Sequence, residues 1–273
     1  MASLLVRSWN LFHGNVLPTG RRAYLEEMVR LVCADHPDVV CLQEVPPWAL
    51  PSLSQWSGMQ AFGDVARRPS IGPLPSTAEI GRALTALHPG LLRSFLAGQA
   101  NAVLLAPPLR AEERRVCVLN PRGFRRVQSR RLRVEPLGRL AWGGERRICQ
   151  ALRVRFPDGR CGVLANVHAT NFWRDTRLPD AEVLRAASFA DGLAKPDEPV
   201  LLCGDFNMRV GRSRTLLELA GPEWGFSKAR RGIDHLLVRG LRVVEGPSRW
   251  PTERRVLRGR LLSDHAPVEV RVE

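Results

Sequence analysis

The sequence predicts an α/β fold with buried strands. Its start reads as a strand from Leu4 to Trp9, a helix from Arg22 to Ala34 and a short apolar strand from Val39 to Leu42. Within the helix, apolar residues recur at helical spacing, namely Leu25, Met28, Val29 and Val32. Alternation of this kind favours an α/β architecture with buried strands. The 273 residues, 44% of them hydrophobic, suffice for a sizeable core.

The later elements continue this alternation. Residues 46–90 are rich in Pro, Gly and Ser and should hold short helices, such as one from Ser76 to Leu87. We expect further helices at Asp180–Leu193 and Ser213–Ala220. Alternating or apolar stretches predict strands at Ala102–Leu105, Arg115–Leu119, Arg130–Glu135, Cys149–Phe156, Gly162–Val167, Val200–Cys203, Ile233–Val238, Leu241–Val244 and Ala266–Val272. Because no linker or repeat interrupts the chain, we expect one domain over residues 1–273.

Composition excludes several classes of protein. The charged fraction of 25% argues against wholesale disorder, and no run of 18 apolar residues provides a membrane span. The N-terminus lacks the basic and apolar segments of a signal peptide. The six cysteines form no C-x-x-C pair, and several stand inside apolar stretches. We therefore expect buried, reduced cysteines and a cytoplasmic protein.

The formal net charge of +14 suggests a polyanionic partner. Only Lys195 and Lys228 among the 41 basic residues are lysine, so compositional bias inflates the arginine count. Fifteen arginines nevertheless fall between Arg110 and Arg160. The densest run comprises Arg122, Arg125, Arg126, Arg130, Arg131 and Arg133. Two interpretations are open: a face that binds nucleic acid, or a solvated edge hairpin that arginines protect from pairing.

Polar residues collect where the predicted strands end or begin. The residues at such positions are Asn10, Gln43-Glu44, His168, Asp205 with Asn207, Asp234 and Asp264-His265. Each has an ordinary explanation alone, such as a turn, a surface carboxylate, a helix cap or a core histidine. Together they fit the rim on which α/β proteins build active sites.

These residues resemble the motifs of the endonuclease/exonuclease/phosphatase superfamily. The matching segments, in the family's order, are Ser8-Trp9-Asn10, Leu42-Gln43-Glu44-Val45, Gly98-Gln99-Ala100-Asn101-Ala102-Val103, Asn166-Val167-His168, Gly204-Asp205-Phe206-Asn207, Gly232-Ile233-Asp234-His235 and Ser263-Asp264-His265. The resemblance implies a four-layered α/β sandwich, with two mixed β-sheets packed face to face and helices on the outside. It also implies a metal-dependent phosphoesterase.

Each matched residue then has an implied role. Glu44 is a hard oxygen ligand suited to Mg²⁺, with Mn²⁺ as the alternative, and Asn10 and Asp264 are the next candidate ligands. Asp205 is expected to orient and deprotonate the attacking water, and Asn207 to donate to a phosphate oxygen. We expect His265, oriented by Asp234, and His168 to contact the phosphate. Asn101 and Asn171 match positions near the substrate groove, although turn formation explains them equally well.

Two features depart from the family pattern. Several nucleases of the family use an active-site tyrosine, but the only tyrosine here is Tyr24, outside any matched motif. Glu145 matches loosely as a carboxylate that supports His168.

The substrate is less constrained than the chemistry. DNA hydrolysis is the leading hypothesis, with Arg122 and Arg126 positioning the phosphate backbone and Trp173 either stacking on the nucleic acid or belonging to the core. The alternatives are hydrolysis of a small phosphoester, such as an inositol phosphate, nucleotide or phospholipid headgroup, and a non-catalytic nucleic-acid-binding protein. The sequence implies no protein partner.

Overall fold

The computed structural model describes residues 3–20, 22–71, 74–87, 97–172 and 174–273. The chain divides into two compact units, which we describe separately. Unit 1 comprises Met1–Leu109 with Val243–Glu273, and unit 2 comprises Arg110–Arg242. The prediction of a single domain stays a prediction.

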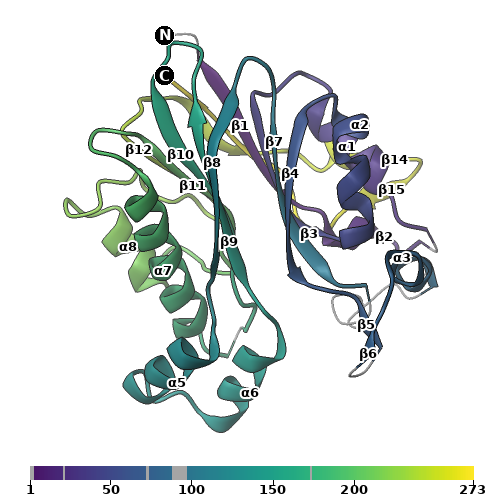
Figure 1. Cartoon of the computed structure of the whole chain (residues 1–273), viewed down its shortest axis with the longest axis horizontal. Helices are drawn as coiled ribbons and strands as arrows, with labels where there is room; N and C mark the ends of the chain where they lie inside the picture. Colours follow the sequence, from purple (N-terminus) through teal and green to yellow (C-terminus); the bar gives the residue numbers. More distant parts are fainter. Residues whose placement is uncertain (1–2, 21, 72–73, 88–96, 173) are drawn as a thin grey trace. The chain divides into compact units, whose positions relative to one another are not determined.

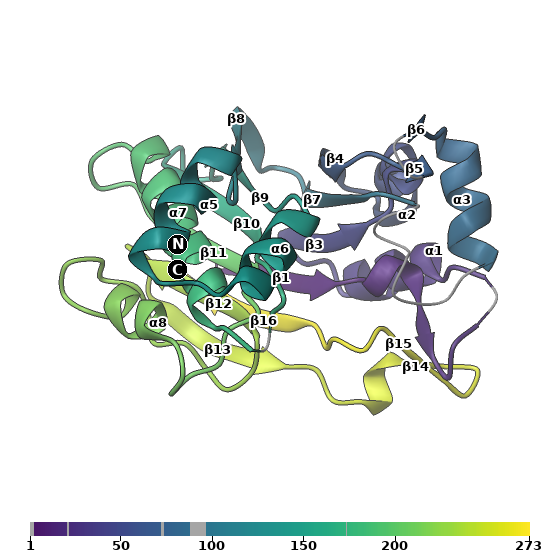
Figure 2. The same cartoon turned by 90° about the horizontal axis from the view of Figure 1, so that it is seen from below.

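Unit 1 is built on a six-stranded mixed sheet with the order β13-β16-β1-β3-β7-β4 (Figures 1 and 2). Its strands are β1 (Leu4–Asn10), β3 (Val39–Val45), β4 (Gln60–Arg67), β7 (Gln99–Leu105), β13 (Val243–Arg249) and β16 (Val268–Val272). Strands β1 and β3 run parallel, and the other neighbours are antiparallel. The helices of this unit are α1 (Leu25–Cys33), α2 (Leu53–Ser57) and α3 (Ala78–Leu87).

Short elements complete unit 1. A three-stranded sheet joins β14 (Val256–Leu257), β15 (Arg260–Leu262) and β2 (Val16–Leu17), and β5 (Ser70–Ile71) pairs with β6 (Leu74–Pro75). The 3-10 turns are η1 (Phe12–Gly14), η2 (Pro47–Ser52) and η3 (Glu253–Arg255).

Unit 2 is built on a five-stranded mixed sheet with the order β12-β11-β10-β9-β8. Its strands are β8 (Arg110–Val118), β9 (Ile148–Arg155), β10 (Cys161–His168), β11 (Val200–Asp205) and β12 (Asp234–Arg239). Only β10 and β11 pair in parallel. The helices are α5 (Arg122–Arg131), α6 (Pro136–Gly144), α7 (Arg177–Leu193) and α8 (Arg214–Leu219). Helices α5 and α6 lie side by side (Figures 1 and 2).

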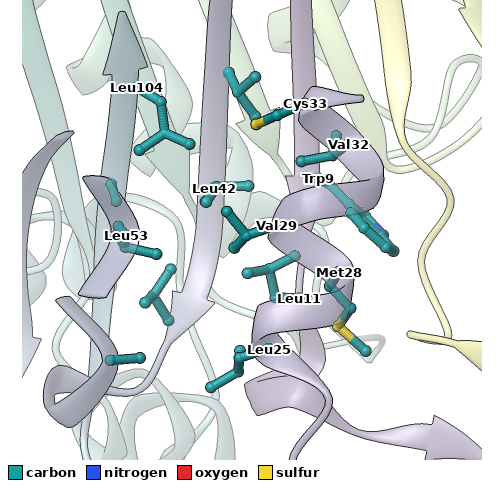
Figure 3. Packing of buried hydrophobic residues seen from close by; sticks show 14 of the residues in the cluster. Trp9, Leu11, Leu25, Met28, Val29, Val32, Cys33, Leu42, Leu53 and Leu104 are labelled. Carbon is teal, nitrogen blue, oxygen red and sulfur yellow. The ribbon is translucent and has the colours of Figure 1, made fainter. Parts of the chain in front are cut away.

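The core of unit 1 forms where α1 packs on the parallel strands (Figure 3). Leu25, Met28, Val29 and Val32 of the helix are fully buried, as are Trp9 of β1 and Leu42 of β3. The predicted spacing of the helix therefore does place one apolar face on the sheet. Burial of each such side chain contributes about 1.5–3 kcal/mol.

The segment around the arginine run differs from the prediction. The expected strand at Arg130–Glu135 is wrong, and so is the edge hairpin, because α5 ends at Arg131, α6 begins at Pro136 and the residues between them form a turn. Phe124 contacts Trp142 edge-on with ring centroids 6.0 Å apart, and Leu132 joins the same cluster. The alternation of Leu132 and Val134 with arginines suggested a strand. Phe124 and Leu132 are also spaced as on one face of a helix, and this second pattern is the one that the structure follows.

Three further findings concern sequence expectations. Strand β4 was not expected between the short helices of residues 46–90. All six cysteines are free, and five of them are buried. Among the residues described, no helix has both the length and the apolar character that crossing a bilayer requires.

Leu42→Ala tests the packing of unit 1, because Leu42 is fully buried between α1 and the sheet. We expect the free energy of unfolding to fall by about 2–5 kcal/mol, as for other buried Leu→Ala changes. The matched control is Leu74→Ala, because the Leu74 side chain is 68% exposed. Denaturant titration of both variants should show the control within about 0.5 kcal/mol of wild type. Equal destabilisation of the two variants would contradict this assignment of the core.

Candidate active site

Among the described strands, each unit contains one parallel pair, and several of the predicted site residues lie at its carboxyl end. In unit 1, α1 connects β1 to β3, which end in Asn10 and Gln43-Glu44-Val45. In unit 2, α7 connects β10 to β11, which end in His168 and Asp205. Because loops at the carboxyl ends of parallel strands are free to vary, such ends commonly carry binding residues.

Glu44 is presented by an irregularity in strand β3. The pairing of β3 with β7 shifts register between Leu42 and Val45, which is a β-bulge, and Glu44 has a φ of 53°. A bulge re-aims a side chain that a regular strand would hold in the pleat. A positive φ is costly for a residue with a side chain and concentrates at functional sites.

The Glu44 carboxylate is surrounded by polar groups of unit 1. Its Oε1 accepts a hydrogen bond from Asn10 Nδ2 at 3.2 Å, and its Oε2 lies 3.3 Å from His13 Nε2. The Asn10 Oδ1 in turn accepts from the backbone N–H of Phe12 at 2.9 Å. Sequence reasoning missed His13, and only its position three residues after Asn10 could have indicated it.

The segment Ser263-Asp264-His265 is tied to the end of β1. Ser263 Oγ donates to the Asn10 carbonyl at 2.7 Å, and Trp9 Nε1 donates to the His265 carbonyl at 2.9 Å. Asp264 remains exposed, whereas His265 is half-buried. Asn101, on β7, is buried.

The oxygen donors of unit 1 have the chemistry that a hard divalent cation requires. Glu44 and Asp264 are carboxylates and Asn10 is an amide, so all three offer hard oxygen ligands. The Glu44 side chain is 19% exposed, which leaves its carboxylate open to water and to a cation. Mg²⁺ requires few protein ligands because it retains several of its waters.

Unit 2 brings three predicted residues into one row. His168 and Asp205 are register partners on β10 and β11, and Asp205 and Asp234 are register partners on β11 and β12. His168, Asp205 and Asp234 are only 3%, 2% and 6% exposed. His168 Nε2 lies 3.8 Å from Asp205 Oδ2. Buried carboxylates so close to one another are costly unless they have partners or a function.

Gly204 makes the close strand approach beside this row possible. Its φ is 135°, and a Cβ at this position would lie 1.9 Å from the Val167 carbonyl oxygen. The position before Asp205 therefore accepts only glycine.

Asp205 and Asn207 form the turn that the sequence left open as an alternative. Asp205 Oδ1 accepts from the Asn207 N–H at 3.0 Å, and Asn207 Nδ2 donates to the Ala169 carbonyl at 2.9 Å. The turn thus fixes the Asp205 carboxylate while Oδ2 faces His168. Turn formation and a role in catalysis are compatible here. Asn171 is exposed, two residues beyond Ala169, and Trp173 lies outside the described residues.

Arg147 is a site residue that sequence reasoning missed. Its Nη1 lies 3.0 Å from Nδ1 and 2.7 Å from Nε2 of His168, and its side chain is buried. Glu145 pairs with Arg147, which links this carboxylate to His168 through the guanidinium. Nothing distinguished Arg147 among fifteen nearby arginines.

Glu182 of α7 anchors the loop that follows His168. Its carboxylate, fully buried, accepts from the Thr170 N–H and Trp142 Nε1, both at 2.6 Å, and from Thr170 Oγ1 at 2.7 Å. Burial raises the pKa of the Glu182 carboxyl, while these hydrogen bonds oppose the rise. Its position on the buried face of a helix suggested no such role.

Comparison with known proteins assigns the chain to a class. A sequence model of the Endonuclease/Exonuclease/phosphatase family matches residues 8–265. The protein is therefore a metal-dependent phosphoester hydrolase. It belongs to the Endonuclease/Exonuclease/phosphatase family. No sequence among the curated proteins matches the chain.

Solved structures show the same fold. A functionally unknown conserved protein from Enterococcus faecalis V583 aligns with a TM-score of 0.67 and 16% identity over 99% of both chains. The human Nocturnin catalytic domain with bound sulfate gives 0.61 and 16%, over 99% of this chain and 94% of that one. D. rerio TDP2 humanized by 14 mutations gives 0.60 and 15% over 100% of both. The predicted α/β class with two mixed sheets and helices is confirmed.

Arg147→Gln tests whether Arg147 positions His168. We expect turnover of a phosphodiester to fall by roughly tenfold to a hundredfold, with KM nearly unchanged, because supporting contacts orient a reacting group without binding substrate. Arg146→Gln is the matched control, since Arg146 is the exposed neighbour. Steady-state kinetics on a chromogenic diester supply the readout, and partial rescue by Arg147→Lys should follow. Turnover equal to the control would refute the assignment.

Proposed function

We propose that this protein is a Mg²⁺-dependent phosphodiesterase that hydrolyses the DNA backbone. The observation that carries the proposal is the buried row of His168, Asp205 and Asp234 at adjacent strand ends of unit 2. A phosphodiester is anionic, so its hydrolysis needs an oriented water, a base and neutralisation of charge. The oxygen ligands of unit 1 supply the last requirement.

In this mechanism the metal ligands and the general base have separate roles. Glu44, Asn10 and Asp264 would hold Mg²⁺, or Mn²⁺, which prefers the same ligands. A bound divalent ion neutralises charge on a phosphoryl oxygen and stabilises the leaving group. Asp205, held by its turn with Asn207, orients the water and removes its proton.

The remaining polar residues bind and orient the phosphate. His168 and His265 donate to phosphoryl oxygens, and Asn207 uses the amide N–H that Ala169 does not occupy. Asp234 orients the imidazole of His265, as the family motif implies. Asn101 and Asn171 contact the substrate farther from the scissile bond.

The choice of DNA rests on the exposed face of α5. Arg122, Arg126 and Arg130 are spaced by four residues, so they form one stripe with steps of about 6 Å along the helix. All three are exposed, and within the described part of the chain none forms an ion pair with an acidic side chain. Like charges at this spacing cost a helix about 0.2–0.5 kcal/mol per pair, so the stripe is better explained by a polyanion than by stability.

Arg122→Ala with Arg126→Ala tests the contact with DNA. We expect weaker DNA binding. The slope of the logarithm of the binding constant against the logarithm of the salt concentration should become smaller by about one for each phosphate that is no longer bound. Hydrolysis of a small diester should stay at the wild-type rate. The matched control is Arg160→Ala with Lys195→Ala, which removes equal charge just before strands β10 and β11 begin. DNA affinity is measured by fluorescence anisotropy at several salt concentrations. Equal weakening of binding in both pairs would show that net charge, not the stripe, binds DNA.

Glu44→Gln tests the metal site. We expect metal affinity to fall roughly tenfold to a hundredfold or more, because an amide is a weaker ligand than a carboxylate. Isothermal titration calorimetry with Mg²⁺ or Mn²⁺ measures this without substrate. Glu26→Gln, on the exposed face of α1, is the control. Unchanged metal affinity in Glu44→Gln would remove Glu44 from the ligand set.

A further inference from the structure

A groove on unit 2 is formed by three helices and the residue directly after one of them. It encloses about 850 Å³ between α5, α7 and α8, a volume within the usual range of ligand sites. Phe124 lines it from α5, Leu132 from the residue directly after α5, and Leu184 from α7. None of its lining residues belongs to the strand ends that carry the candidate site. The groove therefore has no part in the proposed hydrolysis.

The apolar surface of the groove continues past its rim. Val127, three residues after Phe124 on α5, is 59% exposed, and Leu217, three residues after the lining residue Arg214 on α8, is 69% exposed. Residues three apart on a helix are neighbours on its surface. Exposed apolar side chains thus stand beside the groove on both α5 and α8, as at a protein-binding surface.

Arginines line the groove around this apolar floor. Arg185 is held in place, because its guanidinium lies 4.9 Å from the Phe124 ring centroid and its Nε donates to the Val118 carbonyl at 3.2 Å. Arg131 and Arg214 are exposed, and among the residues placed by the structure neither guanidinium forms an ion pair with an acidic side chain. Guanidinium groups bind carboxylates in a bidentate manner.

The other groups in the groove disfavour a nucleic acid there. Asp180 and Glu218 also line the groove, so they would face the unbroken row of charges of a phosphate backbone, whereas a peptide can place uncharged residues opposite them. Phe124 is covered by Arg185 and meets Trp142 edge-on, so its ring is poorly placed to stack on a base. A peptide, in contrast, can direct apolar side chains to the floor and separate carboxylates to Arg131 and Arg214.

We propose that this groove binds an acidic amphipathic segment of a partner protein. Apolar side chains on one face of the segment fill the floor at Phe124, Leu132 and Leu184, and flanking Asp or Glu side chains pair with the arginines. The stripe of Arg122, Arg126 and Arg130 lies on a different face of α5, which leaves DNA binding and partner binding separable.

The test uses a fluorescein-labelled synthetic peptide with Leu at helical spacing on one face and Glu elsewhere. Fluorescence anisotropy measures its binding to the full chain at physiological salt. We expect binding to weaken about fivefold or more in the double variant Arg131→Ala with Arg214→Ala, which removes positive charge from the rim of the groove. We expect the same in Leu184→Gln, which removes apolar surface from its floor. The matched control, Arg122→Ala with Arg126→Ala, should stay within about twofold of wild type.

Three results would overturn the proposal. The first is equal weakening in the two arginine pairs, or equal binding of a peptide with Ser in place of Leu, because general charge attraction would then suffice. The second is binding of a single-stranded oligonucleotide that displaces the peptide and depends on Arg131 and Arg214. The third is undiminished peptide binding in Ser188→Trp. This variant places a large side chain in the groove from an exposed position, and it replaces Leu184→Gln as the test if that variant fails to fold.

Discussion

One parallel strand pair in each of the two large sheets is the constraint on which the candidate site residues depend. A helix must cross between two parallel neighbours, so α1 and α7 each cover one face of their sheet and leave the strand ends to loops. The carboxyl ends of both pairs carry polar residues: Asn10 and Glu44 in unit 1, and His168 and Asp205 in unit 2. Gly204 fits this constraint closely, because any side chain there would strike the Val167 carbonyl.

The chemistry of unit 2 depends on how its buried charges are compensated. Asp205 is held by the Asn207 N–H, Arg147 is paired with Glu145, and Glu182 receives three hydrogen bonds. Buried polar groups held in this way keep a fixed orientation because any rearrangement would leave a charge unsatisfied. Such pre-organisation is what a reaction on an anionic ester requires.

Much of this arrangement could be predicted from the sequence, because it follows from local patterns. The apolar face of α1 and the polar residues after β3, β10 and β11 are visible as periodicity and as abrupt changes in polarity. The contacts of Arg147 and Glu182 could not be predicted, since they join residues 21 and 40 positions apart in the chain. The helix at Arg122 was missed for a related reason: its contact with Trp142 is set by tertiary packing. The arginine stripe became recognisable only once the segment proved helical.

The most direct test of the account is nicking of supercoiled plasmid, with and without Mg²⁺, by the wild type and by Asp205→Ala. We expect nicking by the wild type only when Mg²⁺ is present, and loss of nicking in Asp205→Ala with DNA binding retained. Nicking by Asp205→Ala at the wild-type rate, or no nicking by either protein with Mg²⁺, would contradict it.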